Sequence, residues 1–129
     1  ELVKDHGIKR GILLPVSAPF HCPLMQPAAD AMAHALADAA LSAPLVPVYA
    51  NVIAAPVADA ETIKRLLVEQ VTGRVRWRES VIAMSAAGVT DFVEFGGKVL
   101  APMVKRSVPD AQATSLISMD DIEAIAKSL

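Results

Sequence analysis

Two adjacent side chains in a proline-bounded stretch could carry proton-transfer or nucleophilic chemistry. His21 and Cys22 lie between Pro19 and Pro23. A histidine changes charge near physiological pH and therefore suits a general base. Packing or capping at a helix start explains His21 equally well from its position alone. Cys22 could act as a nucleophile beside it, but sequence neighbours seldom point at each other, so the pattern disfavours a Cys–His pair.

A second polar residue occurs where the helical pattern calls for an apolar one. Gln70 falls on the apolar stripe of Leu66, Leu67 and Val71. A polar group that faces a core needs a hydrogen-bond partner. The alternative is a boundary residue that reaches water, and the pattern alone favours that alternative.

One histidine has acidic neighbours at helical spacing. His34 lies four residues from both Asp30 and Asp38. This arrangement could hold a metal ion, but it is more typical of a solvated helix face. We therefore predict no metal site.

Two further groups could meet anions. Gly96, Gly97 and Lys98 separate a predicted strand from a predicted helix, as in phosphate cradles. They complete neither the dinucleotide glycine pattern nor the P-loop pattern, so the phosphate signal is weak. A basic cluster, Arg74 to Arg78 around Trp77, could contact an acidic partner or be a solvated segment.

Short apolar runs alternate with longer amphipathic stretches along the chain, which predicts an α/β fold. Strands are predicted at 12–16, 44–51, 91–95 and 113–117. Helices are predicted at 23–40, 60–71, 78–87 and 99–104, with a last one from 118 or 119. His21 then follows the end of a strand, where ligands gather in open α/β sheets.

Composition excludes several classes of protein. Twelve basic against fourteen acidic residues and 4% aromatics argue against a nucleic-acid binder. One cysteine excludes a disulfide framework and a cysteine-built zinc site, and it suits a reducing cytosol. No apolar run reaches the roughly 18 residues of a membrane span. We therefore expect a cytoplasmic protein without nucleic-acid or membrane partners.

The apolar fraction is high for 129 residues, at 53% with a mean hydropathy of +0.43. A chain of this length buries only about two-thirds of its unfolded surface. The chain also opens on a helical pattern without an N-terminal cap. Both observations lead us to expect a piece of a larger domain, whose apolar surplus packs against something outside this sequence.

Residues Pro15 to Met25 resemble the active-site histidine region of malonyl-CoA:acyl carrier protein transacylases, a family that also includes polyketide acyltransferase domains. Further blocks resemble the family in the same order along the chain: 24–29, 43–52, 67–77 and 92–100. Several spaced blocks in order make the resemblance specific.

The resemblance implies a transferase of fatty acid synthesis. His21 would be the catalytic base in malonyl transfer from coenzyme A to the phosphopantetheine thiol of acyl carrier protein, through a serine-bound intermediate. Gln70 matches the position whose backbone carbonyl orients that histidine, a part that a carboxylate plays in the usual triad. Phe20 matches a bulky substrate-binding residue that would exclude branched acyl groups. Malonyl-CoA and holo acyl carrier protein are substrates, and no cofactor is implied.

Two departures from the family pattern matter. The Gly96-Gly97-Lys98 turn is one residue shorter than the family's Gly-Pro-Gly-Lys, and the Gly-x-Ser-x-Gly nucleophile turn does not occur. The resemblance therefore implies only the C-terminal part of such an enzyme. Residues 1–16 would end its ferredoxin-like small subdomain, and residues 17–129 would form the C-terminal part of its hydrolase-like parallel-sheet core.

Such a chain would need the missing N-terminal part of the same enzyme as its partner and would be inactive alone. Two alternatives stay open at this point. One is a fragment of a polyketide synthase acyltransferase domain, and the other is a non-catalytic module that binds carrier protein.

Overall fold

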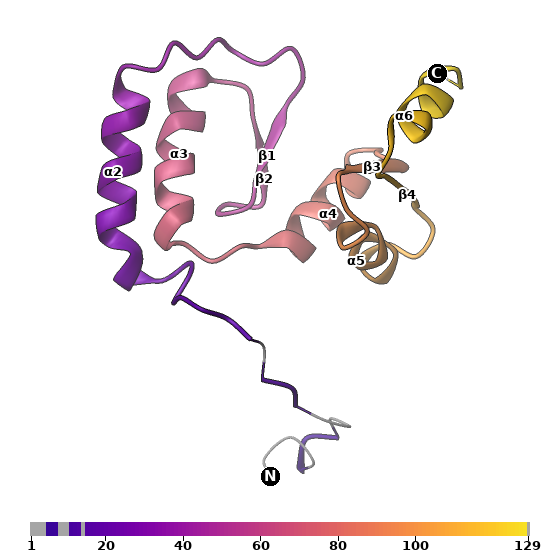
Figure 1. The fold of residues 1–129 in the computed structure, drawn as a ribbon, viewed down its shortest axis with the longest axis horizontal. Coiled ribbons are helices and arrows are strands. Elements are labelled where there is room, and N and C mark those ends of the chain that lie inside the picture. Colours follow the sequence, from indigo (N-terminus) through magenta and orange to yellow (C-terminus); the bar gives the residue numbers. More distant parts are fainter. Residues whose placement is uncertain (1–4, 8–10, 14, 129) are drawn as a thin grey trace.

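The computed structural model describes residues 5–7, 11–13 and 15–128. Helices and short strands alternate along it in the following order: η1 (Pro23–Met25, a 3-10 turn), α2 (Gln26–Ala37), β1 (Val48–Ala50), β2 (Ala55–Val57), α3 (Ala60–Thr72), α4 (Trp77–Ala86), β3 (Asp91–Phe95), α5 (Leu100–Ser107), β4 (Gln112–Leu116) and α6 (Met119–Ala126). Helices α2 and α3 lie side by side next to the β1–β2 hairpin, whereas α4, α5 and α6 surround β3 and β4 (Figure 1).

The part of the chain from α4 to α6 has the predicted α/β arrangement. Strands β3 and β4 pair in parallel, from Asp91 opposite Gln112 to Phe95 opposite Leu116. Helix α5 connects them, as a parallel pair requires a crossover. The most deeply buried cluster lies here, where Val81 of α4 and Val104 of α5 pack with Ala111. The α/β prediction is confirmed for this part of the chain.

Most predicted helices form close to their expected bounds because periodicity and end signals agree. Asp59 caps α3 by accepting a hydrogen bond from the Thr62 N–H at 2.7 Å. Ser118 and Asp121 form a reciprocal capping box at the start of α6. The last helix therefore begins where the sequence predicts it.

The predicted strand at 12–16 is wrong for the residues that the structure describes. Residues 11–13 and 15–16 have no strand conformation, and the Leu13 side chain is 98% exposed. A strand needs neighbours for its backbone hydrogen bonds, and the described chain places none beside this stretch, which leads away from the helices (Figure 1). Leu14 and the first four residues of the predicted opening helix lie outside the described residues.

The predicted extended segment at 44–51 is largely irregular. Only Val48–Ala50 forms a strand, which pairs antiparallel with Ala55–Val57. This second strand was not predicted, since a three-residue strand that contains Pro56 has no clear alternation.

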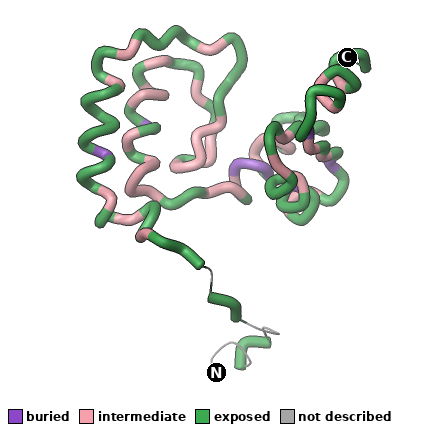
Figure 2. Tube along the Cα trace, viewed as in Figure 1, coloured by how far each residue is buried: buried purple, intermediate pink, exposed green. Residues whose placement is uncertain are grey.

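Large apolar side chains are exposed along much of the described chain. Leu24, Leu45 and Phe95 are 74%, 103% and 70% exposed, and buried positions are sparse along the trace (Figure 2). The expected apolar surface is therefore present. Within the described residues, no helix is long and apolar enough to cross a membrane.

A carboxylate fills the turn that resembles a phosphate cradle. Glu94 of β3 accepts hydrogen bonds from the backbone N–H groups of Val99, Leu100 and Ala101 at 2.9, 2.9 and 3.0 Å. Its Oε2 also accepts from Ser115 Oγ at 2.9 Å. The N–H groups that would bind a phosphate are thus already used by the protein itself. The phosphate interpretation of residues 96–98 is not supported.

These contacts predict an acid-sensitive stabilisation. The N–H of Leu100, followed by those of Ala101 and Val99, lowers the pKa of Glu94 from 4.5 to about 2. Because the folded-state pKa is depressed, the stabilisation is complete above about pH 4.5 and is lost as the pH falls toward about 2. We expect Glu94→Gln to lower the urea midpoint at neutral pH, and the difference from the parent to shrink by about half at pH ~3.

A matched control is Glu123→Gln, which removes an exposed carboxylate 4.0 Å from Lys127. It should leave the midpoint nearly unchanged at both pH values, since exposed ion pairs contribute little. Urea denaturation followed by circular dichroism measures both variants. An equal effect of Glu94→Gln at pH 7 and pH ~3 would contradict the assignment.

Candidate functional site

His21 lies in a tight turn between the irregular N-terminal stretch and η1. Its φ of 56° is in the left-handed region, which a residue with a side chain seldom adopts. Two contacts hold the turn: Phe20 N–H donates to Ala18 O at 3.0 Å, and Cys22 Sγ donates to Pro19 O at 3.0 Å. Backbone strain of this kind concentrates at functional sites.

The imidazole of His21 contacts the end of a distant helix. Its Nδ1 lies 2.9 Å from the backbone oxygen of Gln70, which is 49 residues away in sequence. Gln70 is in the last turn of α3, where carbonyl groups lack a partner within the helix. Because α2 and α3 pack side by side, the turn before α2 lies next to the end of α3.

This contact fixes the tautomer of the neutral ring. A carbonyl oxygen can only accept a hydrogen bond, so Nδ1 must carry the proton. The lone pair then lies on Nε2, the nitrogen on the other side of the ring. His21 is therefore arranged to take up a proton at Nε2.

The Gln70 side chain lies at the boundary between the protein and water. It is half-buried, and its Nε2 donates to the backbone oxygen of Gly73 at 2.9 Å. The partial exposure agrees with the boundary interpretation that the pattern favours, and the amide has a hydrogen-bond partner in addition. The amide spans the turn that follows α3.

Gly73, which follows α3 and was not singled out from the sequence, leaves no room for a side chain. A Cβ on Gly73 would lie 2.8 Å from Glu69 O and 2.8 Å from Val52 Cγ2. Its φ of −90° is open to any residue, so the requirement for glycine is one of space. A glycine directly after a helical pattern is a common helix terminator, and this signal could have drawn attention to Gly73.

The segment after Gly73 is attached to the β1–β2 hairpin. Arg76 N–H donates to Asn51 O at 3.0 Å, and Arg76 Nη1 donates to Ile53 O at 3.0 Å. Ser80, which is 1% exposed, donates from Oγ to Asn51 Oδ1 at 2.9 Å. These contacts hold the start of α4 against the hairpin, and none was predicted.

The other candidates lie apart from this contact. Phe20 is adjacent to His21 in sequence and 56% exposed. The Cys22 thiol donates a hydrogen bond to Pro19 O, and Pro19 O is thus the partner found for it instead of the His21 ring. His34 Nδ1 contacts Asp30 O within its own helix at 2.8 Å. Among the described residues, no group of three or more His, Cys, Asp or Glu could hold a metal ion.

Two arginines of the basic cluster around Trp77 form ion pairs with a nearby glutamate. Glu79 Oε1 lies 3.0 Å from Arg74 Nη2 and 3.4 Å from Arg76 Nε. This ion pairing favours the solvated interpretation of the cluster for Arg74 and Arg76.

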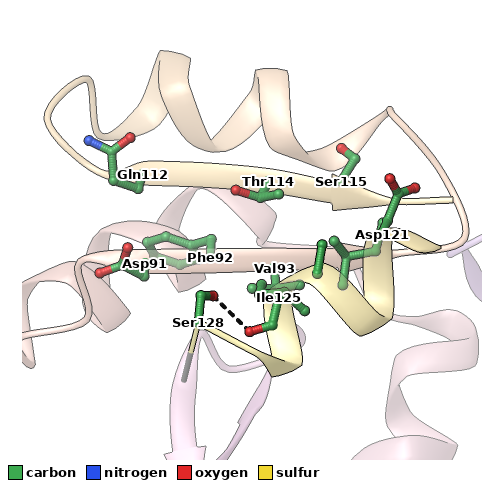
Figure 3. Close-up of a pocket in the computed structure, with 11 residues that line it drawn as sticks. Asp91, Phe92, Val93, Gln112, Thr114, Ser115, Asp121, Ile125 and Ser128 are labelled. Atoms are coloured by element: carbon green, nitrogen blue, oxygen red, sulfur yellow. Dashed lines mark hydrogen bonds between the residues drawn. The ribbon is translucent and has the colours of Figure 1, made fainter. Parts of the chain in front are cut away.

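Two hollows in the described part of the chain differ in whether they include a predicted site residue. A cavity of about 610 Å³ lies between the β3–β4 pair and α6, where Ser128 Oγ donates to Ile125 O at 2.7 Å (Figure 3). It contains none of the predicted site residues. A smaller one of about 160 Å³ lies between β1 and α3 and is lined in part by Gln70, Tyr49 and Asn51.

Comparison with known proteins adds to this geometry. No protein-family model matches the chain. Malonyl CoA-acyl carrier protein transacylase from Salmonella typhimurium is 46% identical over 114 residues, which are 88% of this chain and 37% of that protein. The resemblance is thus to malonyl-CoA:acyl carrier protein transacylases. The chain matches the C-terminal part of these transacylases, and it spans about two-fifths of their length.

Solved transacylase structures share this fold. The acyl-carrier-protein-S-malonyltransferase of Bartonella henselae has a TM-score of 0.89 and 48% identity, covering 98% of this chain and 41% of that one. A malonyl-transacylase in complex with a type II polyketide acyl carrier protein has a TM-score of 0.87 and 35% identity, again covering 98% and 41%. The resemblance to the transacylase family is confirmed.

Proposed function

We propose that this chain supplies the histidine half of the acyl-transfer site of a malonyl-CoA:acyl carrier protein transacylase. The observation that carries the proposal is the 2.9 Å contact between His21 Nδ1 and Gln70 O. A base held by a carbonyl oxygen presents Nε2 in the form that accepts a proton. The main-chain oxygen takes the orienting part that a carboxylate has in the usual triad.

The proposed reaction has two acyl transfers. His21 Nε2 takes the proton of a serine hydroxyl as its oxygen attacks the malonyl thioester of coenzyme A, and the proton then goes to the departing coenzyme A sulfur. In the second transfer, His21 takes the thiol proton of the phosphopantetheine arm, whose sulfur attacks the malonyl-serine ester. The serine oxygen leaves and recovers the proton.

The negative end of α3 supports the charge that His21 acquires. The unsatisfied carbonyls of a helix C-terminus carry partial negative charge, which stabilises a nearby cation. Gln70 O is one of those carbonyls and contacts the ring directly. The imidazolium that forms during each transfer is therefore stabilised where it arises.

The serine must come from outside this sequence, since no Gly-x-Ser-x-Gly motif occurs in it. We propose that the N-terminal part present in the relatives supplies it and covers the exposed apolar surface. In this arrangement residues 1–16 end a ferredoxin-like subdomain and residues 17–129 belong to a hydrolase-like core. The exposed ring of Phe20 would then line the acyl pocket.

The substrates in this proposal are malonyl-CoA and holo acyl carrier protein, in fatty acid synthesis. A structural relative in complex with an acyl carrier protein supports the second of them. The relatives and structures compared above are named as malonyl transacylases, so the polyketide-fragment alternative is not favoured. No observation favours a non-catalytic binding module.

A chimera tests this proposal. The part of the Salmonella typhimurium relative that precedes the match is joined to this chain, and malonyl transfer from malonyl-CoA to holo acyl carrier protein is measured. We expect the chimera to transfer malonyl groups and the isolated chain to show no transfer above background, because the chain has no nucleophilic serine turn. Turnover by the isolated chain, or a folded chimera without activity, would overturn the proposal.

A further inference from the structure

Helix α3 ends without the left-handed glycine that often closes a helix. Gly73 has φ −90° and ψ 151°, so the chain leaves the helix in an extended conformation. Its N–H donates to Glu69 O at 2.8 Å, which is the last bond of the helical ladder. The carbonyls beyond Glu69 O depend on groups from elsewhere.

Gln70 takes part in two contacts at this helix end, one through its backbone and one through its side chain. Its backbone oxygen receives His21 Nδ1, and its amide Nε2 donates to Gly73 O. Both distances are 2.9 Å. The side chain therefore bridges from the carbonyl that meets His21 to the turn immediately after it.

The two ends of this turn are held by different groups. At Arg76 the backbone is fixed by Asn51 O of the hairpin turn, with Ser80 bonded to the same asparagine. At Gly73 the backbone has the Gln70 amide and close packing against Val52. Loss of the amide would loosen only the end of the turn that adjoins α3, where the bond from Gly73 N–H to Glu69 O would remain.

We propose that the Gln70 side chain is a positioning group, whose amide holds the turn after α3 and thereby keeps Gln70 O directed at His21 Nδ1. The effect on catalysis rests on the function proposed above. The amide itself touches no substrate. It acts through its own backbone carbonyl on the orientation of the His21 ring.

The test uses the chimera and its Gln70→Leu variant, which keeps the backbone oxygen and removes the amide donor. We expect kcat to fall about 3- to 10-fold with KM unchanged, as for the loss of one hydrogen bond that acts on the reacting geometry. Nitrogen-15 NMR of the histidine rings, with His21 assigned by a His21→Gln variant, should show a smaller fraction of the Nδ1–H tautomer in Gln70→Leu.

A second variant and a control separate positioning from general stability. Gln70→Glu keeps the length of the side chain but presents an acceptor to Gly73 O, and it should lower kcat at least as much as Gln70→Leu. Glu69→Leu changes the preceding position, whose side chain pairs with Arg65, and should leave both kcat and the His21 tautomer unchanged.

Two results would overturn the proposal. One is that the Gln70 variants have the kcat and the His21 tautomer of the parent chimera. The other is that Glu69→Leu lowers kcat and the fraction of the Nδ1–H tautomer as much as Gln70→Leu does. If the unsubstituted chimera transfers no malonyl group, the proposed function fails, and the tautomer comparison alone then decides this inference.

Discussion

Replacement of His21 by alanine in the chimera is expected to lower kcat for malonyl transfer about 10⁴- to 10⁶-fold. Removal of the base from a serine–histidine site has effects of this size, because the serine is then left without a proton acceptor. The contact with Gln70 O indicates that the neutral ring carries its lone pair on Nε2. A stopped-flow or discontinuous assay with malonyl-CoA and holo acyl carrier protein measures the loss.

The chain offers a matched control for this substitution. His34 is also exposed, and its Nδ1 contacts a backbone oxygen, Asp30 O, at 2.8 Å, but within a single helix. His34→Ala should therefore leave kcat within about twofold of the parent. A His21→Ala chimera with near-parental activity would remove this histidine from the mechanism.

Substitution of Gly73 by alanine should damage both stability and activity. The added Cβ would lie 2.8 Å from Glu69 O and from Val52 Cγ2, so the helix end or the hairpin must move. Overpacking of this kind costs about 1–3 kcal/mol. A shift of the helix end also displaces Gln70 O, and a displacement of ~1 Å near reacting groups can lower the rate about 100-fold.

Two measurements on the chimera check this expectation: the free energy of unfolding in urea, and kcat. Gly88→Ala provides a contrast, because no atom lies within 4 Å of an added Cβ there, although its φ of +95° adds backbone strain. Gly88→Ala should therefore lower stability while kcat stays near the parental value. If Gly73→Ala retains parental kcat, the position of the α3 terminus does not control the histidine.

The helices and the parallel strand pair were the most predictable parts of the fold. Apolar spacing, the Asp59 cap and the Ser118 capping box indicate α3 and α6 locally, and the run from Asp91 to Phe95 forms the predicted strand. The stretch at 12–16 shows the limit of such reasoning. Its apolar run satisfies strand propensity, but a strand also requires a neighbour to receive its backbone hydrogen bonds.

The candidate site was predictable only in part, for a physical reason. Residue type and location single out His21, whereas every residue has a backbone carbonyl, so no pattern of side chains marks Gln70 O as its partner. The helical pattern drew attention to Gln70 as a polar residue on an apolar stripe, but only the resemblance to the transacylase family related it to His21. The amide contact with Gly73 and the space constraint at Gly73 depend on packing between α3 and the hairpin, which the sequence pattern does not encode.

The partner of His21 is a main-chain oxygen, and this determines which mutations the contact can tolerate. Every residue type retains its backbone oxygen, so a substitution at position 70 can redirect the acceptor that meets His21 but cannot remove it. Insertion or deletion of one residue within α3 is different, because each residue turns a helix by about 100°. Such a change would rotate the terminal carbonyls away from the imidazole. The length of α3 is thus a heritable property that brings the two groups together, and the Gln70 side chain can act only on a carbonyl that this length has already placed.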